Sequence, residues 1–211
     1  MNNEVTSYGG VVVAALPLAL LAATRSHDRP SEVLEDEDLS ISLPRRLGLS
    51  SVIVTQIQRY ETAARSGKKV SHDEFVNLLK LVLRRPDAEP ILRETGALVA
   101  QRQFEKVSPS WLKVLRVLPR AAVNAVIRRA TRRLLRNISA SDEITVHGNP
   151  IRAQIKKPVA AFLEPPGVGC ALYGAAFEEL ASLYLNKKTG VTPASCASQN
   201  GEFCMWELTK A

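Results

Sequence analysis

Cysteine is scarce in this sequence. The 211 residues include only three cysteines, Cys170, Cys196 and Cys204. A small and odd number argues against a fold stapled by disulfides and is typical of a reducing compartment. We therefore expect a cytoplasmic protein. Association with a membrane surface is compatible with this expectation.

The chain also lacks a long apolar run. A helix that crosses a bilayer needs about 20 apolar residues. The candidate run, residues 11–24, is shorter and contains Pro17, and no Lys or Arg precedes Arg25. A signal peptide would begin with basic residues, so this segment does not match one. It predicts a helix that is either buried or in contact with a membrane surface.

Signatures of common enzymes are missing. The sequence has no P-loop, no GxGxxG, no GxSxG and no HExxH pattern. Its histidines, His27, His72 and His147, stand in unrelated contexts. These absences favour a binding protein over an enzyme.

Acidic residues are absent from one long segment. Residues 106–141 hold nine basic residues and no acidic one, which leaves 19 basic against 21 acidic residues in the rest of the chain. The net charge of +7 therefore arises in this segment. Helical spacing over residues 119–137 puts apolar residues on one face and arginines on the other. The apolar stripe is Val123, Ile127, Ala130 and Leu134, and the basic surface is Arg129, Arg132, Arg133 and Arg136.

The basic surface has three interpretations. It could be a solvated face, paired with the acidic arm of residues 32–38 in the same or a second copy of the chain. It could dock on an anionic membrane or a protein partner, or bind nucleic acid. Nucleic acid is disfavoured because no recognised nucleic-acid-binding motif accompanies the arginines.

The order of predicted elements indicates an α+β fold. Residues 1–45 read as an apolar segment followed by the acidic arm, and residues 46–211 as one domain. Helical patterns fill residues 50–137. Two hairpins follow, around Gly148 and around residues 197–201, with a helix after Cys170 between them. We expect helices packed on an antiparallel sheet made from the two hairpins, with that helix crossing the sheet.

The cysteines are placed so that they can meet. Cys196 and Cys204 flank the second hairpin turn, and Cys170 stands at the start of the crossing helix. Three thiolates suit Zn²⁺, which usually takes four ligands in a structural site. The spacing is not the CxxC of a zinc ribbon, however, and free cysteines often simply pack in a core. The residues alone leave both possibilities open.

Together with two glycines, a glutamate and a phenylalanine, the cysteine pattern resembles a known family. The run that carries the resemblance is Cys170, Gly174, Glu178, Cys196, Gly201, Phe203 and Cys204. It is similar to the 4-vinyl reductase-like domain, found in bacteriochlorophyll 4-vinyl reductase-type proteins and in phenol-sensing domains of bacterial transcription activators. The fold is shared with transport-protein-particle subunits. The resemblance is best over residues 118–208.

The resemblance implies a metal site with one departure. Family members that bind metal hold zinc with three cysteines at these positions and a glutamate three residues before the second. Pro193 stands at that place here and cannot ligate. Either a water or Glu202 completes a zinc site, or the thiols are reduced and buried.

The resemblance also implies a pocket for an apolar or aromatic ligand, a tetrapyrrole among the candidates. His147 could offer that ligand a hydrogen bond. The expected wall residues are Trp111, Leu115, Val126, Phe162, Tyr173, Phe177 and Trp206. Aromatic residues at helical spacing are also what a plain core contains. We expect a stand-alone carrier or sensor, as a homodimer or part of a larger complex. The alternative is a structural or partner-binding subunit that docks through the basic surface.

Overall fold

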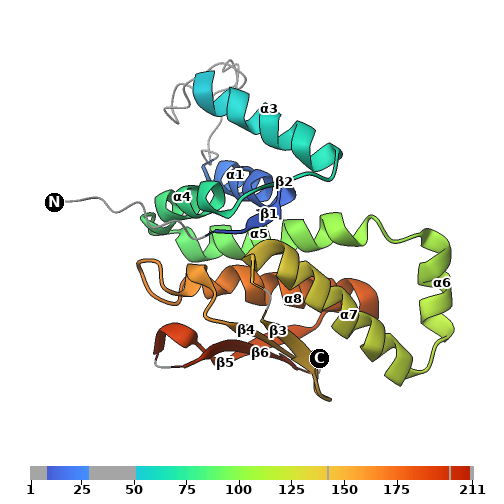
Figure 1. The fold of residues 1–211 in the computed structure, drawn as a ribbon. Coiled ribbons are helices and arrows are strands. Elements are labelled where there is room, and N and C mark those ends of the chain that lie inside the picture. Colours follow the sequence, from blue (N-terminus) through green and yellow to red (C-terminus); the bar gives the residue numbers. More distant parts are fainter. Residues whose placement is uncertain (1–8, 29–50, 142, 200, 210–211) are drawn as a thin grey trace, which may run out of the picture.

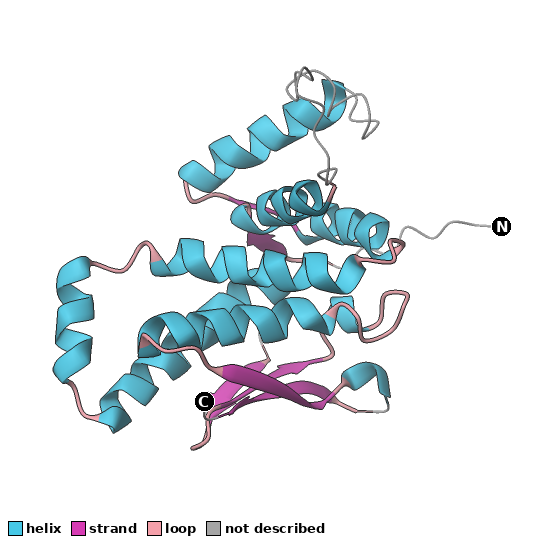
Figure 2. Cartoon of the chain, turned by 180° about the vertical axis from the view of Figure 1, so that it is seen from behind, coloured by secondary structure: helices cyan, strands magenta, loops and turns pink. Residues whose placement is uncertain are grey.

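The computed structural model describes residues 9–28, 51–141, 143–199 and 201–209. These residues form the predicted α+β fold (Figures 1 and 2). The helices are α1 (Ala15–His27), α3 (Ser51–Arg65), α4 (His72–Leu83), α5 (Ala88–Phe104), α6 (Pro109–Val117), α7 (Arg120–Ser139) and α8 (Cys170–Leu185). The strands are β1 (Val11–Val13), β2 (Lys69–Ser71), β3 (Ile144–His147), β4 (Arg152–Lys156), β5 (Gly190–Ser195) and β6 (Phe203–Thr209), with 3-10 turns η1 (Val159–Ala161) and η2 (Ala197–Gln199).

The elements are stacked in layers on one face of the main sheet. That sheet is antiparallel throughout, in the order β3-β4-β6-β5, so the two predicted hairpins pair with each other through β4 and β6. Helices α7 and α8 lie on the sheet, α5 packs on α8, and α1 packs on α5. Helix α6 connects α5 to α7 at the edge of the molecule (Figure 1).

Alternation along the strands decides which side chains face the helices. Ile155 is paired with Cys204, and Ala153 with Trp206, and all four are at most 3% exposed. The residues between them, Gln154 and Met205, point to the other face and are less buried. Because side chains alternate along a strand, Cys204 and Trp206 share the covered face.

Helix α7 confirms the predicted division between its faces. Ile127 and Leu134 of the apolar stripe are 0% and 1% exposed, while Val123 and Ala130 pack at the edge of the core. The four arginines of the basic surface are exposed. Burying a guanidinium without a partner is costly, so the helix turns its apolar side inward.

The N-terminal apolar run is only partly helical. Residues 11–13 form strand β1, antiparallel to β2, and this small sheet was not predicted. Three consecutive valines favour a strand, since β-branched side chains restrict a helix. Helix α1 follows and includes Pro17 in its first turn, where proline is tolerated. Leu16 and Leu20 of α1 are 0% exposed. Of the two predicted alternatives, a buried helix or one in contact with a membrane, α1 is therefore the buried helix.

Two expectations concern residues outside the described part of the chain. The acidic arm of residues 32–38 and the domain boundary near residue 45 both fall there. In the described residues, no helix is both long enough and apolar enough to span a membrane.

Candidate metal centre

Cys204 is placed by strand β6. Its position opposite Ile155 directs the sulfur toward the helices, and the side chain is 0% exposed. The backbone N–H of Ala197 donates a hydrogen bond of 3.3 Å to this sulfur. The sheet and the β5–β6 connection therefore hold Cys204 Sγ from two sides.

Cys196 stands where β5 gives way to the η2 turn. The pairing of β5 with β6 shifts register between Pro193 and Ser195, which bends the end of β5. Because β5 is an edge strand, Pro193 can lie in it without breaking hydrogen bonds to a further strand. The return to β6 is tight, because a Cβ at Gly201 would come within 3.0 Å of the Cys196 carbonyl oxygen. Glycine at 201 thus lets the turn bring Cys196 back beside Cys204.

Cys170 is the first residue of α8. The loop before it carries Gly167 at φ 86°, a conformation that favours glycine, and Gly169, whose added Cβ would overlap the backbone of Ala160. A Cβ on Gly167 would also lie 3.6 Å from Cys196 Sγ. These glycines let the loop pass closely over η1 and the turn, so that α8 begins at the sulfur cluster.

The three sulfurs meet at one point. Cys170 Sγ lies 3.1 Å from Cys204 Sγ and 3.6 Å from Cys196 Sγ, and the remaining pair is 3.9 Å apart. All three are free thiols. Sulfurs bound at ~2.3 Å to one tetrahedral zinc ion lie about 3.8 Å apart, close to what is seen here. The predicted convergence of the cysteines is confirmed, and the cluster could bind a metal ion.

The cluster favours one thiolate near neutral pH. The hydrogen bond from Cys170, helped by the Ala197 N–H, lowers the pKa of the Cys204 thiol to about 7. The same bond raises the pKa of Cys170, as do its burial and the neighbouring sulfur charges. A second and a third thiolate would repel the first at this distance. A divalent cation removes that repulsion, because it becomes the largest local charge.

The fourth ligand position is not filled by an acidic side chain. Among the described residues, the group of converging potential ligands consists of the three cysteines. Pro193 and Glu202 are both exposed. The site thus offers three sulfurs and one open position, the pattern of zinc sites that keep a place for water or another ligand.

Two hydroxyl groups lie beside the sulfurs. Ser198 Oγ is 3.0 Å from Cys196 Sγ, and the sequence pattern gave no signal for it. Tyr173 stands one helical turn after Cys170, and its hydroxyl is buried with no hydrogen-bond partner among the described residues. Burial, together with the charges of Cys170 and Cys204, raises the pKa of Tyr173. The Tyr173 hydroxyl is therefore held in its neutral form.

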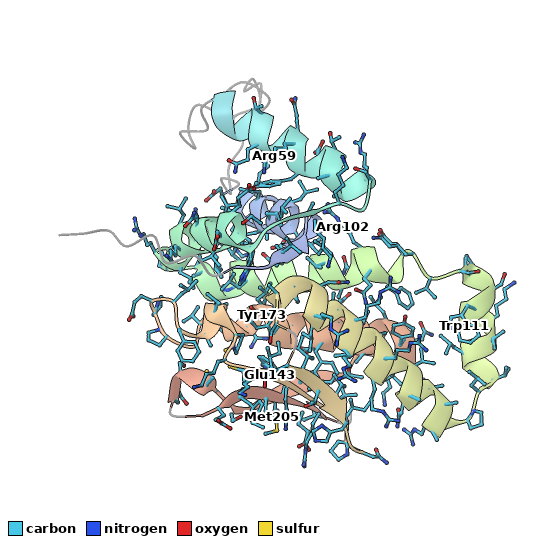
Figure 3. All side chains as sticks on the ribbon, viewed as in Figure 1. Arg59, Arg102, Trp111, Glu143, Tyr173 and Met205 are labelled. Atoms are coloured by element: carbon cyan, nitrogen blue, oxygen red, sulfur yellow. The ribbon has the colours of Figure 1, made fainter. Side chains whose placement is uncertain are left out.

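The predicted pocket wall is not a single surface. Tyr173, Phe177 and Trp206 are at most 3% exposed in the layer between α8 and the sheet, where Tyr173 and Trp206 meet edge to face with ring centroids 6.0 Å apart. Phe162 is 49% exposed at the end of η1. His147, at the end of β3, is also exposed. Figure 3 places Tyr173 on α8 and Trp111 far from it on α6.

Trp111 and Val126 instead line a separate pocket, named here the α5–α7 pocket. It has a volume of about 460 Å³ and lies between α5, α6 and α7, with contributions from Val13, Ala15 and Tyr184. Its apolar lining includes Val99, Val107, Trp111, Val126 and Leu134. Leu115 lines a different groove of about 740 Å³ between α6, α7 and the end of α8.

Four cations also line the α5–α7 pocket: Arg102, Lys106, Arg129 and Arg133. No acidic residue belongs to its lining. Arg129 and Arg133 come from the basic surface, whereas Arg132 and Arg136 do not reach the pocket lining. The sequence showed the charge of α7 as a helix face. It could not show that Arg102 of α5 and Lys106, just after α5, line the same pocket.

No protein-family model, curated protein or solved structure matches this chain significantly.

Proposed function

We propose that this protein is a small-molecule carrier or sensor of the 4-vinyl reductase-like kind, with a zinc ion held by its three cysteines. The observation that carries the proposal is the convergence of Cys170, Cys196 and Cys204 from a helix start, a turn and a strand. The resemblance implies this arrangement, which sequence spacing alone left open. Bound there, zinc would cross-link α8 to the β5–β6 hairpin.

The α5–α7 pocket is the proposed ligand site. Pockets for small molecules are typically about 300–1,000 Å³, mostly apolar, with a few placed polar groups. A volume of about 460 Å³ and walls of Trp111, Val126 and Leu134 fit this description. We therefore assign the apolar or aromatic ligand to this pocket, and assign Tyr173 and Phe177 to the core.

Native mass spectrometry tests the metal and the ligand together. We expect one zinc per chain and a co-purified small molecule. Cys204→Ser should lose the zinc, because it removes the sulfur whose thiolate the site favours most. Ser198→Ala is the matched control, since it changes a side chain beside the cluster but removes no sulfur. Zinc retained at full occupancy in Cys204→Ser would contradict the three-cysteine site.

A second candidate function rests on the surface of α6. Trp111, Val114 and Val117 are 45%, 42% and 82% exposed, and they lie at helical spacing on one short helix. The exposed arginines of α7 follow it in the chain. Exposed apolar residues beside cations suit the surface of an anionic membrane better than nucleic acid. Binding to lipid vesicles is the measurement that separates this function from ligand carriage.

A further inference from the structure

Arg102 is the least compensated cation of the α5–α7 pocket. One of its terminal nitrogens, Nη1, is buried and has no hydrogen-bond partner among the described residues. Burying a guanidinium group without a partner is unfavourable, and native structures usually pair it. Arg102 therefore lines the pocket as a partly buried cation whose hydrogen-bonding capacity is not filled by the described residues.

The charges around Arg102 reinforce this reading. Lys106 lies just after the end of α5, and Arg129 and Arg133 line the same pocket from α7. In the described residues none of the four forms an ion pair, although seven other ion pairs are present. A low-dielectric pocket lined by one sign of charge attracts the opposite sign. The lining therefore favours an anionic ligand.

The rest of the lining excludes a bare anion as the whole ligand. Trp111, Val126 and Leu134 offer apolar surface beside the cations. A purely apolar molecule would leave Arg102 unpaired, and a free inorganic anion would leave the apolar wall uncovered. A molecule with both parts satisfies the two sets of residues at once.

We propose that the α5–α7 pocket binds an anionic amphiphile, with a carboxylate, phosphate or sulfonate group at Arg102 and an apolar or aromatic body against Trp111. This proposal rests on the proposed small-molecule function and names its ligand class. Arg102 offers the anion charge-assisted hydrogen bonds, which are stronger than those between neutral groups. Arg129 and Arg133, which are exposed, attract the ligand toward the pocket.

Matched probes test the charge requirement. Decanoate and decanol have the same chain length and differ in charge, and calorimetric titration of the full-length protein at low salt gives both affinities. Decanoate should bind at least about tenfold more tightly than decanol, and far more tightly than inorganic phosphate. In Arg102→Gln decanoate should bind no better than decanol. Arg132→Gln removes an exposed arginine outside the pocket lining, and should change the affinity for decanoate less than about twofold.

A stability measurement separates ligand binding from a structural role of Arg102. Without ligand, the melting temperature of Arg102→Gln should equal or exceed that of the wild type, because the change removes a partly buried cation that has no ion pair in the described residues. A fall in melting temperature with unchanged affinity for decanoate would overturn the proposal. Arg133→Gln is a second variant at the more exposed side of the pocket, where weaker decanoate binding is again expected.

The remaining outcomes distinguish this inference from the proposed function. Equal affinity for decanoate and decanol would overturn the anionic ligand but keep an apolar small-molecule site. Binding of neither decanoate, decanol nor the neutral aromatic 2-naphthol would overturn both. Binding of the protein to vesicles that contain phosphatidylglycerol shows whether the amphiphile is a membrane lipid or a free molecule. If Arg102→Gln weakens binding to decanoate alone, the ligand is a free molecule; if it also weakens binding to vesicles, the ligand is a membrane lipid.

Discussion

His72 shows how one buried side chain links stability to pH. It is 2% exposed at the start of α4, and its Nδ1 lies 3.2 Å from the carbonyl oxygen of Gly9, just before β1. Burial lowers the pKa of His72, although the hydrogen bond to Gly9 opposes this effect. The imidazole is therefore held in its neutral form, in contact with the N-terminal segment.

The folded protein should lose stability in weak acid because of His72. Its pKa is lower in the folded than in the unfolded chain, so the unfolded chain binds more protons below about pH 6.5. The stability contribution of His72 is then complete above that pH and declines as the pH falls through the lower, folded value. We expect His72→Asn, which can still donate to Gly9, to lessen the fall in melting temperature between pH 7.5 and pH 5.

The exposed His147 provides the control for this experiment. His147→Asn makes the same change at an exposed position, and so controls for the loss of one imidazole from the chain. If His72→Asn gives the wild-type slope, acid sensitivity arises elsewhere and the neutral state of His72 is not what links folding to pH.

At the scale of elements, α5 and α8 are held together by small residues. A Cβ on Gly96 of α5 would overlap the carbonyl oxygen of Leu172 and lie 2.8 Å from the backbone nitrogen of Ala176. Both neighbours belong to the backbone of α8, which a rotamer change cannot move. Gly96 therefore sets how closely α5 approaches the helix that carries Cys170.

Gly96→Ala should destabilise the protein although alanine is the better helix former. The gain in helix propensity is about 1 kcal/mol, whereas overpacking in a core typically costs about 1–3 kcal/mol. A backbone clash belongs at the upper end of that range, so chemical denaturation should show a net loss. Ala97→Gly on the same helix measures the propensity term alone. A variant as stable as the wild type would mean that α5 and α8 separate easily.

Such backbone contacts mark the limit of what the sequence could predict. The helices, the two hairpins and the inward stripe of α7 follow from periodicity and turn residues, which act locally. The meeting of Cys196 and Cys204 follows from a hairpin, and that of Cys170 from the resemblance. Strand β1 escaped prediction because its partner β2 lies about sixty residues away, and three valines inside an apolar run do not reveal a pairing at that distance.

The pocket wall was harder still, because it depends on tertiary placement. Trp111, Tyr173 and Trp206 look alike in sequence, as large apolar residues beside helical or strand patterns. Yet Trp111 is 45% exposed while Tyr173 and Trp206 are in the core. The cations of the α5–α7 pocket come from α5, from the turn after it and from α7, and no local pattern sets the relative rotation of these two helices.

At the scale of the whole molecule, charge and apolar exposure coincide. Helix α6 stands at the edge of the fold, and α7 carries the basic surface directly after it (Figures 1 and 2). Each exposed cation attracts an anionic membrane by about 1 kcal/mol near its surface, and the attraction is screened by salt. Among the described apolar side chains of α6, Val117 is the most open to contact with lipid, at 82% exposed.

We therefore expect vesicles with anionic lipid to bind the protein at low salt, and zwitterionic vesicles to bind it weakly. Arg132→Gln combined with Arg136→Gln should reduce this binding, because both residues are exposed and lie outside the lining of the α5–α7 pocket. Affinity for decanoate should stay within about twofold in the same variant, since screened surface charges contribute little to a site they do not contact. Val117→Ser should weaken vesicle binding by loss of apolar contact while leaving its dependence on salt unchanged. Sedimentation with vesicles over a range of salt concentrations measures both effects. Equal binding to anionic and zwitterionic vesicles would contradict a role of the basic surface in membrane docking. Its arginines would then be either solvated or part of the pocket lining.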